Sequence, residues 1–401
     1  MSHPALNHAR LSPAQRALAE VVGDFASPAQ RDATLRGWAG SSELMQLALR
    51  QHLAGRFADR VDQASALSRS GWRAQEAVLG DARCGSRIRV LKRRAQAGFA
   101  LRALADAGLR ANPLKGLVLA ERYYEEEHHR EMGDLDILVA GDFDAGLRAL
   151  LAAGAAHAYA DPHKQEHERK DAHQVALTLP LPASMILELH WRLYADMRAS
   201  AVQDIAAHAV SGSCAGAPAW LPAHEHHLVL CAHHVVTSIS PEPPCELRWW
   251  LDLDQMVRAG ATDWDRWARV AIAWGIPMTA ALGLIGAVQL FGSPVPERVW
   301  SEIERAMVPM ERRVLRLALR EGAYDLNRDV VMAALWLNRT QGHRTRSVAR
   351  LAITPRIAAK YRKDLARLPV AAAAGYLTLQ RIVRIARAGA AHLKLWLERE
   401  E

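Results

Sequence analysis

Apolar side chains recur at every third or fourth position along most of the chain. Residues 44–57 (LMQLALRQHLAGRF) and 90–108 (VLKRRAQAGFALRALADAG) are clear examples, and this spacing is typical of amphipathic helices. Gly108 stands where the second helix should end, because glycine favours the C-terminal cap. We therefore predict a helical N-terminal region over residues 1–108, in which no catalytic motif is evident.

The pattern changes between residues 109 and 200. Short apolar runs of strand length occur at residues 135–140 (LDILVA), 173–179 (HQVALTL) and 185–191 (MILELHW), and Asp142 precedes a helical pattern that reaches residue 155. These segments predict a small mixed β-sheet. The expected fold class is therefore α+β, mostly α, with this sheet flanked by N- and C-terminal helical regions.

Helical patterns return after Pro222, in a helical domain predicted over residues 201–300 and a further region over 301–401. A loop with three prolines, residues 237–244, separates two of these helices. The uncharged stretch 270–296 is long enough to cross a bilayer, but Pro277 and four glycines interrupt it. We expect a buried helical hairpin or a core helix there, and no membrane span.

The composition is that of a folded, soluble protein, since half of the residues are apolar and 23% are charged. The four cysteines form no C-x-x-C pair, and the first ten residues lack the apolar core of a signal peptide. Cytoplasmic localisation is therefore expected, because a reducing compartment suits free thiols.

The net charge of +8 is concentrated in residues 301–401, which hold 20 Lys and Arg against 10 Asp and Glu. The basic amphipathic helix in this region is compatible with binding to nucleic acid or anionic lipid. Acidic residues end it, however, and no aromatic residues alternate with the basic ones. A solvated helix face is the preferred interpretation, and nucleic acid is not an expected partner.

The strongest chemical signal is the segment Gly133-Asp134-Leu135-Asp136 in the first predicted strand. Side chains alternate along a strand, so Asp134 and Asp136 point to the same face. A divalent cation would relieve their repulsion, and magnesium prefers such oxygen ligands. Glu188, on another predicted strand, is the candidate third carboxylate. A D-x-D pair alone is weak, because most such pairs are merely solvated.

Lys115 and Gly116 stand at the start of a predicted helix upstream of the paired aspartates. A glycine there lets backbone N–H groups approach a phosphate, and the lysine adds a positive charge. Lys115 could instead be an ordinary surface lysine. Arg130, a further candidate for a functional role, could instead form only a surface ion pair with the neighbouring glutamates.

Histidines and tryptophans between residues 224 and 274 suggest two further kinds of site. His227, Cys231 and His234 share a helix face, but no acidic or cysteine partner follows at a spacing usual for zinc, so structural histidines are preferred. Core packing is preferred over base stacking for the tryptophans, because they lie in the neutral part of the chain. These are Trp249, Trp250, Trp264, Trp267 and Trp274.

Together these residues resemble a known family, the bacterial nucleotidyltransferase family proteins of the polymerase-β superfamily. The resemblance rests on Leu114-Lys115-Gly116, on Arg130-Glu-Met-Gly133-Asp134-Leu-Asp136-Ile-Leu-Val139 and on Glu188-Leu-His190-Trp191. It extends loosely to two helices that hold His233, Arg248 and Asp252, and it covers about residues 95–300.

The resemblance implies a metal-dependent enzyme that transfers a nucleoside monophosphate from an NTP, with ATP expected, to a hydroxyl or phosphate acceptor and releases pyrophosphate. It implies metal binding, to Mg²⁺ or Mn²⁺, by Asp134, Asp136 and Glu188. It implies contacts with the triphosphate by Lys115, Gly116, Arg130 and Gly133, and supporting positions around them for His190, His233, Arg248 and Asp252. The acceptor, whether a small molecule, a peptide or a protein, is left open.

Two departures from the better-known superfamily members affect this expectation. They carry Gly-Ser where this chain has Lys115-Gly116, so the phosphate contacts cannot be copied from them. The acidic and histidine-containing run at residues 125–129 also suggests a lengthened loop before the paired aspartates. Two other functions stay open: a non-catalytic module whose degenerate site binds nucleotide or a partner protein, and nucleic-acid binding through the basic C-terminal helix.

Overall fold

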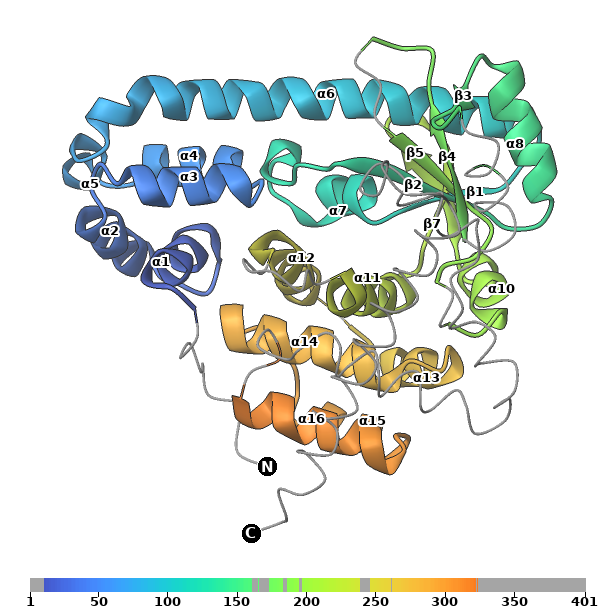
Figure 1. Cartoon of the computed structure of the whole chain (residues 1–401). Helices are drawn as coiled ribbons and strands as arrows, with labels where there is room; N and C mark the ends of the chain where they lie inside the picture. Colours follow the sequence, from blue (N-terminus) through green and yellow to red (C-terminus); the bar gives the residue numbers. More distant parts are fainter. Residues whose placement is uncertain are drawn as a thin grey trace, which may run out of the picture.

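A computed structural model of the chain describes residues 11–160, 165, 173–182, 186–194, 197–238, 246–260, 262–321 and 323. Most of these residues lie in helices, and two small sheets supply the strands (Figure 1). The predicted α+β, mostly α fold class is confirmed. The basic C-terminal helix and most of the proline-containing loop at 237–244 lie outside the described residues, and the predicted division at residues 108, 200 and 300 stays a prediction.

From residue 11 onward, where the described part of the chain begins, six α-helices precede the central sheet. Serines 12 and 27 cap the first two in capping boxes, and a proline occupies the first turn of each. The last of the six is 31 residues long and extends over the others to the sheet (Figure 1). Gly108, with φ of 73°, follows it as predicted. The helices are α1 (Pro13–Val22), α2 (Pro28–Gly37), α3 (Ser42–Arg50), α4 (Ala54–Gln63), α5 (Ala66–Ser70) and α6 (Glu76–Asp106), with a 3-10 turn, η1 (Arg73–Gln75), before α6.

The central sheet has five strands in the order β1-β2-β5-β4-β3. Strand β2 runs parallel to β5, and the other neighbours are antiparallel. The strands are β1 (Ala111–Leu114), β2 (Asp134–Val139), β3 (Ala156–His157), β4 (Gln174–Thr178) and β5 (Ile186–His190). Helix α7 (Gly116–Tyr123) and the 3-10 turn η2 (Glu127–His129) lie between β1 and β2, and α8 (Phe143–Ala152) follows β2.

The predicted elements of this region match β2, α8, β4 and β5, and Asp142 caps α8 by accepting a hydrogen bond from the Ala145 amide. Strand β1 was not predicted, because Asn112 and Pro113 are poor strand formers. Proline is tolerated there because β1 is an edge strand. Strand β3 has only two residues, too few to leave a periodic signal.

A second, two-stranded sheet interrupts the region that was predicted to be helical. Helix α10 (Ser200–Ala207) leads into β6 (Val210–Cys214), which pairs with β7 (Ala217–Leu221). Both turn residues, Ala215 and Gly216, have positive φ, as a tight hairpin requires. The Asn112 amide nitrogen donates to the Trp220 carbonyl at 2.8 Å, which fastens the hairpin to β1. Ala-Gly is a weaker hairpin signal than Asn-Gly or Asp-Gly, so the sequence did not predict this hairpin.

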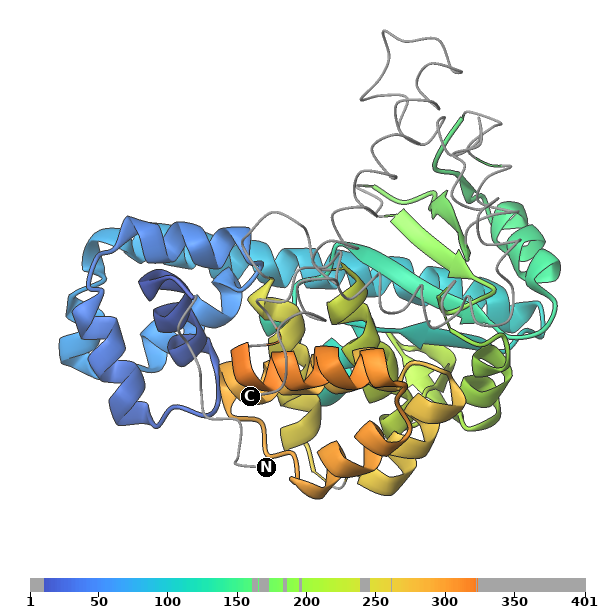
Figure 2. The ribbon, with the colours of Figure 1, turned by 60° about the horizontal axis from the view of Figure 1, so that its bottom comes forward.

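In the described part of the chain six helices follow the hairpin, and they are stacked in layers beneath α7 (Figure 1). The last of them, drawn in orange, lie in front in Figure 2. The helix in the middle, α14, has all of its residues buried, so the predicted core helix in the uncharged stretch 270–296 is confirmed. No helix in the described part of the chain is long and apolar enough to span a bilayer. The helices are α11 (His224–Ser238), α12 (Leu247–Arg258), α13 (Trp264–Ala273), α14 (Pro277–Phe291), α15 (Arg298–Arg305) and α16 (Pro309–Glu321).

Among the residues that the structure describes, the apolar core consists of two clusters. One is formed by the sheet, α6, α8 and the hairpin, and the other joins the N-terminal helices to α11–α16. Four of the five tryptophans predicted to be core residues are buried, as expected. Trp249 differs, because it is only partly buried and lines a pocket.

We predict that Gly286 on α14 cannot be enlarged without loss of stability. A Cβ atom at this position would overlap the ring of Trp250. Gly286→Ala should therefore lower the free energy of unfolding by about 1–3 kcal/mol, the usual cost of overpacking. The control is Gly80→Ala in α6, where a Cβ meets no atom within 4 Å, and it should stabilise by about 0.5–1 kcal/mol. Urea denaturation measures both; equal effects would contradict the packing argument.

Candidate active site

Three acidic side chains lie on the adjacent strands β2 and β5. Asp134 and Asp136 are two residues apart on β2, and Asp136 is paired in register with Glu188 on β5. Because paired residues of neighbouring strands share a face, the three side chains lie on one face of the sheet. Asp136 is buried, Glu188 is partly buried and Asp134 is exposed. The structure therefore brings together the three carboxylates that the sequence singled out.

Asp136 is held by two nitrogen donors. Lys115 Nζ lies 2.7 Å from Asp136 Oδ1, and His190 Nε2 lies 3.0 Å from the same oxygen and 3.9 Å from Glu188 Oε2. The Lys115 side chain is only 12% exposed, so the alternative of an ordinary surface lysine is wrong. His190 was expected in a supporting position, but it contacts the carboxylates directly.

The charges in this cluster are strongly coupled. Burial opposes ionisation of Asp136, but Lys115 and His190 outweigh it and hold the pKa of Asp136 below its ordinary range. Burial also opposes the charge on Lys115, yet Asp136 raises the pKa of Lys115 well above its usual value. Desolvation, followed by repulsion from Asp136, raises the pKa of both Asp134 and Glu188. One lysine thus faces three acidic groups, which leaves an excess of negative charge. The carboxylate oxygens of these groups are ligands that a hard divalent cation prefers.

The backbone of Lys115 is strained. Its φ of 49° and ψ of −125° are rare for a residue with a side chain, and such conformations cost on the order of 1–3 kcal/mol. The Lys115 amide donates to His227 Nε2 at 3.0 Å, which holds the turn in place. The next residue, Gly116, begins α7, and a Cβ on it would lie 3.0 Å from Met132 Cβ. Close packing is therefore one reason for glycine at this position.

Asp134 and Asp136 border a pocket of about 120 Å³, whereas Glu188 and His190 are not among its lining residues. Most of the predicted site residues line it, and so do several that the sequence did not indicate, including Trp249. His233 does not line it: its Nδ1 lies 2.7 Å from Thr279 Oγ1 in the helical core, and His234 faces the pocket instead. The lining residues are Lys115, Gly116, Leu119, Arg130, Met132, Gly133, Asp134, Asp136, Cys231, His234, Val235, Arg248, Trp249 and Asp252.

Two buried arginines form a wall of the pocket. Arg130 Nε donates to Asp252 Oδ1 at 2.6 Å, and the Tyr124 hydroxyl donates to the same oxygen at 2.6 Å. Arg130 and Arg248 both donate to the carbonyl of Glu131. Arg130 is therefore paired with an aspartate of α12, and the alternative of a surface ion pair with neighbouring glutamates is wrong. No sequence signal pointed to Tyr124.

The histidines of α11 have structural partners. His227 Nε2 accepts the Lys115 amide hydrogen, and His234 Nδ1 lies 2.6 Å from the Tyr194 hydroxyl. Burial lowers the pKa of His227 to about 3. Among the described residues, none of the three groups with metal-compatible geometry contains His227, Cys231 or His234. These observations agree with the preferred interpretation of structural histidines.

We predict that Asp252 is the most sensitive residue of the pocket wall. Asp252→Ala leaves the buried Arg130 without its counter-charge, which should lower the free energy of unfolding by about 3–5 kcal/mol. Tyr124→Phe removes only one hydrogen bond to the same carboxylate and should cost about 1.5–3 kcal/mol. Urea denaturation measures both. An Asp252→Ala variant as stable as the wild type would mean that the carboxylate does not neutralise Arg130.

Comparison with known proteins adds a family to this geometry. Residues 39–292 match the model of a family described as uncharacterised nucleotidyltransferase. The match covers more than half of the chain, and includes both the pocket and helices α4–α6. No curated protein and no solved structure matches the chain. The chain therefore belongs to the family of uncharacterised nucleotidyltransferases.

Proposed function

We propose that the protein is a metal-dependent nucleotidyltransferase of the polymerase-β type. It transfers a nucleoside monophosphate from an NTP, with ATP the expected donor, to a hydroxyl or phosphate group of an acceptor. The observation that carries this proposal is the position of Asp134, Asp136 and Glu188 on neighbouring strands, with the two aspartates lining a pocket that positively charged side chains also line. Few other chemistries need both features in one place.

Asp134, Asp136 and Glu188 are the proposed ligands of Mg²⁺ or Mn²⁺. When bound, the metal would draw negative charge from the phosphate oxygens and make the acceptor hydroxyl more acidic. Asp136 is prepared for this role because Lys115 and His190 keep its carboxylate ionised. His190 Nε2 lies 3.0 Å from Asp136 and 3.9 Å from Glu188, so it orients the first of these proposed ligands and lies beside the second.

Lys115, Arg130 and Arg248 are the proposed electrostatic partners of the triphosphate. All three line the pocket that Asp134 and Asp136 border. Asp252 and the Glu131 carbonyl fix the Arg130 guanidinium, so its charge needs no reorganisation when a phosphate arrives. Gly116 and Gly133 line the same pocket, and a Cβ on Gly133 would meet no atom within 4 Å. In the transfer, an acceptor hydroxyl releases its proton to solvent as its oxygen bonds to the α-phosphorus. The bond from this phosphorus to the oxygen that bridges it to the β-phosphorus breaks, and pyrophosphate leaves.

The apolar part of the pocket is the proposed place for the nucleoside or the acceptor. Leu119, Met132, Val235 and Trp249 lie among its lining residues, and a partly buried indole offers a flat surface to a planar group. A small molecule, a peptide or a protein side chain is the proposed acceptor class. Nucleic acid is not, and a cytoplasmic location is proposed on the grounds of the free thiols.

We predict that nucleotide transfer depends on the paired aspartates. With magnesium, labelled ATP and a panel of acceptors, Asp134→Asn and Asp136→Asn should each lower the rate of pyrophosphate release by 10²-fold or more, since removing one charge-stabilising group costs roughly this much. The control is Asp142→Asn, because Asp142 caps α8 away from the pocket and asparagine also caps helices. Full activity in both pocket variants would refute the assignment.

A non-catalytic nucleotide-binding module is the second candidate. The observation in its favour is the ion pair between Lys115 and Asp136 at 2.7 Å, because it neutralises one proposed metal ligand without a metal. A degenerate site would keep this pair and bind nucleotide without chemistry.

Calorimetry distinguishes the two candidates. For the enzyme we predict that ATP affinity falls at least tenfold when magnesium is removed by a chelator, because the carboxylates then repel the phosphates. Asp136→Asn should weaken this dependence on magnesium. Equal ATP affinity with and without magnesium, together with no turnover across the acceptor panel, would favour the non-catalytic module.

A further inference from the structure

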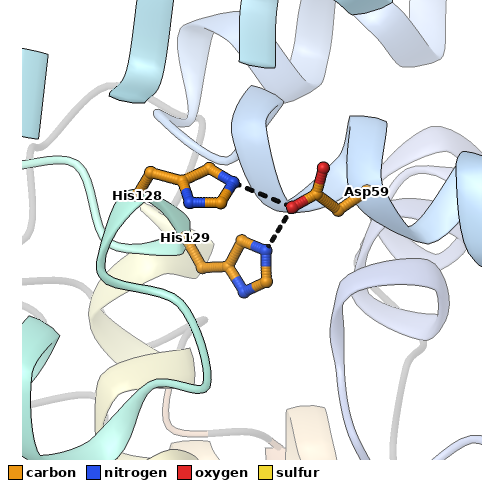
Figure 3. Close-up of side chains that lie close together, drawn as sticks. All are labelled: Asp59, His128 and His129. Atoms are coloured by element: carbon orange, nitrogen blue, oxygen red, sulfur yellow. Dashed lines mark hydrogen bonds and ion pairs between the residues drawn. The ribbon is translucent and has the colours of Figure 1, made fainter. Parts of the chain in front are cut away.

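A second cluster of metal-binding side chains lies outside the pocket. Asp59 on α4 faces the adjacent residues His128 and His129, which lie in η2 (Figure 3). The Nε2 atoms of both rings are 2.8 Å from the same oxygen, Asp59 Oδ2. The proposed nucleotidyl transfer makes no use of these residues. They belong to the run at 125–129 that the sequence suggested was a lengthened loop.

The three donor atoms converge in a buried place. The side chains of His128 and His129 are 4% and 1% exposed, and that of Asp59 is 13% exposed. The His129 Nδ1 atom is also buried and has no hydrogen-bond partner among the described residues. The three donor atoms are thus shielded from solvent.

The donor set suits a zinc ion. Two imidazole nitrogens and one carboxylate oxygen are common zinc ligands, and bonds of about 2.0–2.2 Å in a tetrahedral arrangement place ligand atoms roughly 3.3 Å apart. The observed separations of 2.8 Å therefore need to widen by only about 0.5 Å. Arg83 Nε lies 3.7 Å from the other oxygen, Asp59 Oδ1, but Arg83 also pairs with Asp62, so its charge is partly neutralised.

Besides the groups at Asp136 and at Asp59, a third group of acidic and histidine side chains has metal-compatible geometry. This group is less suitable for zinc. Asp204, His208 and His226 also lie close together, and His226 is buried. The rings of His208 and His226 are stacked, however, with an interplanar angle of 29°. Stacked rings direct their lone pairs side by side instead of toward one point. His208 Nδ1 is also 2.9 Å from the Asp204 carbonyl. This group therefore serves as a matched control.

We propose that Asp59, His128 and His129 bind a zinc ion that fastens the N-terminal helices to the segment leading into β2. Arg130 and Glu131 follow the two histidines directly, and Asp134 begins β2. Glu131 is itself tied to α6, where Arg89 donates to both of its carboxylate oxygens, at 2.8 and 3.0 Å. A metal at this point would fix the start of the strand that carries the paired aspartates. The site is separate from the pocket and does not depend on the proposed function.

The test is zinc binding by the full-length protein after treatment with a chelator. We expect the wild type to bind zinc and to unfold at a higher temperature with it, reversibly on chelation. Asp59→Asn keeps a hydrogen-bond acceptor for the histidines but loses the charged ligand, and it should bind about one equivalent less. His129→Gln should lose the same equivalent, since each removes one of three protein ligands.

His226→Gln is the control, and it should leave the number of bound zinc ions and the zinc-dependent thermal shift unchanged. X-ray absorption at the zinc edge of wild-type protein gives a second measurement that needs no variant to fold. Nitrogen and oxygen ligands without sulfur are expected. Unchanged zinc binding in both Asp59→Asn and His129→Gln, or no zinc bound by the wild type, would overturn the proposal and leave two histidines that only donate hydrogen bonds to Asp59.

Discussion

The ion pair between Lys115 and Asp136 is the contact on which the rest of the site depends. A buried carboxylate without a partner costs several kcal/mol, and Asp136 lies between two further acids. The strained turn at Lys115 delivers the compensating charge, and the bond from its amide to His227 connects this turn to α11. The cluster on β2 and β5 therefore depends on α7, which follows this turn, and on α11, which holds the turn through His227, so the helices are part of the site.

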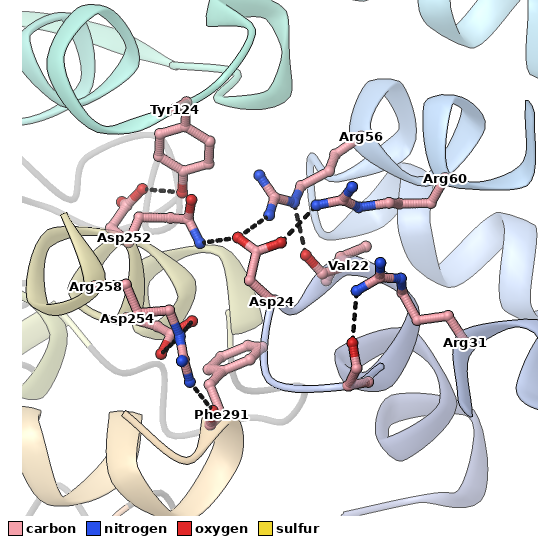
Figure 4. A network of polar contacts seen from close by, with 12 residues as sticks. Val22, Asp24, Arg31, Arg56, Arg60, Tyr124, Asp252, Asp254, Arg258 and Phe291 are labelled. Carbon is pink, nitrogen blue, oxygen red and sulfur yellow. Dashed lines mark hydrogen bonds and ion pairs between the residues drawn. The ribbon is translucent and has the colours of Figure 1, made fainter. Parts of the chain in front are cut away.

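A second chain of polar contacts connects the pocket to the N-terminal helices. Asp252 accepts hydrogen bonds from Tyr124 and Arg130, and the Arg56 guanidinium lies 5.6 Å from the centre of the Tyr124 ring. Arg56 is paired in turn with Asp24, as Figure 4 shows. Asp24 also accepts a hydrogen bond from the Gln255 side chain of α12. Burial raises the pKa of Asp24, but Arg56, Gln255 and Arg60 outweigh it and leave the pKa lowered. An N-terminal region without catalytic motifs thus supports the pocket wall.

The sequence predicted those parts of the structure whose signals are local. Strand β2 and its acids were visible because alternation along a strand is a short-range rule, and the core helix α14 was visible from its uncharged composition. The sequence could not show whether His233 or His234 faces the pocket. Neighbouring helical residues point about 100° apart, and only packing decides which one faces a pocket. The partner of Arg130 was equally hidden, because Asp252 lies 122 residues away in sequence. The pairing of β1, with its proline, depends on an edge position that only the assembled sheet defines.

The segment from Tyr124 to Asp134 explains why these distant parts form one site. Tyr124 and Arg130 reach α12 through Asp252, His128 and His129 reach α4 through Asp59, and Glu131 reaches α6 through Arg89. A loop whose side chains point in turn to three separate helices cannot shift without breaking buried polar contacts, each of which is costly to leave unmade. Its C-terminal end is the first proposed metal ligand. The residues of this segment therefore help the sheet to hold Asp134 and Asp136 in position relative to Lys115.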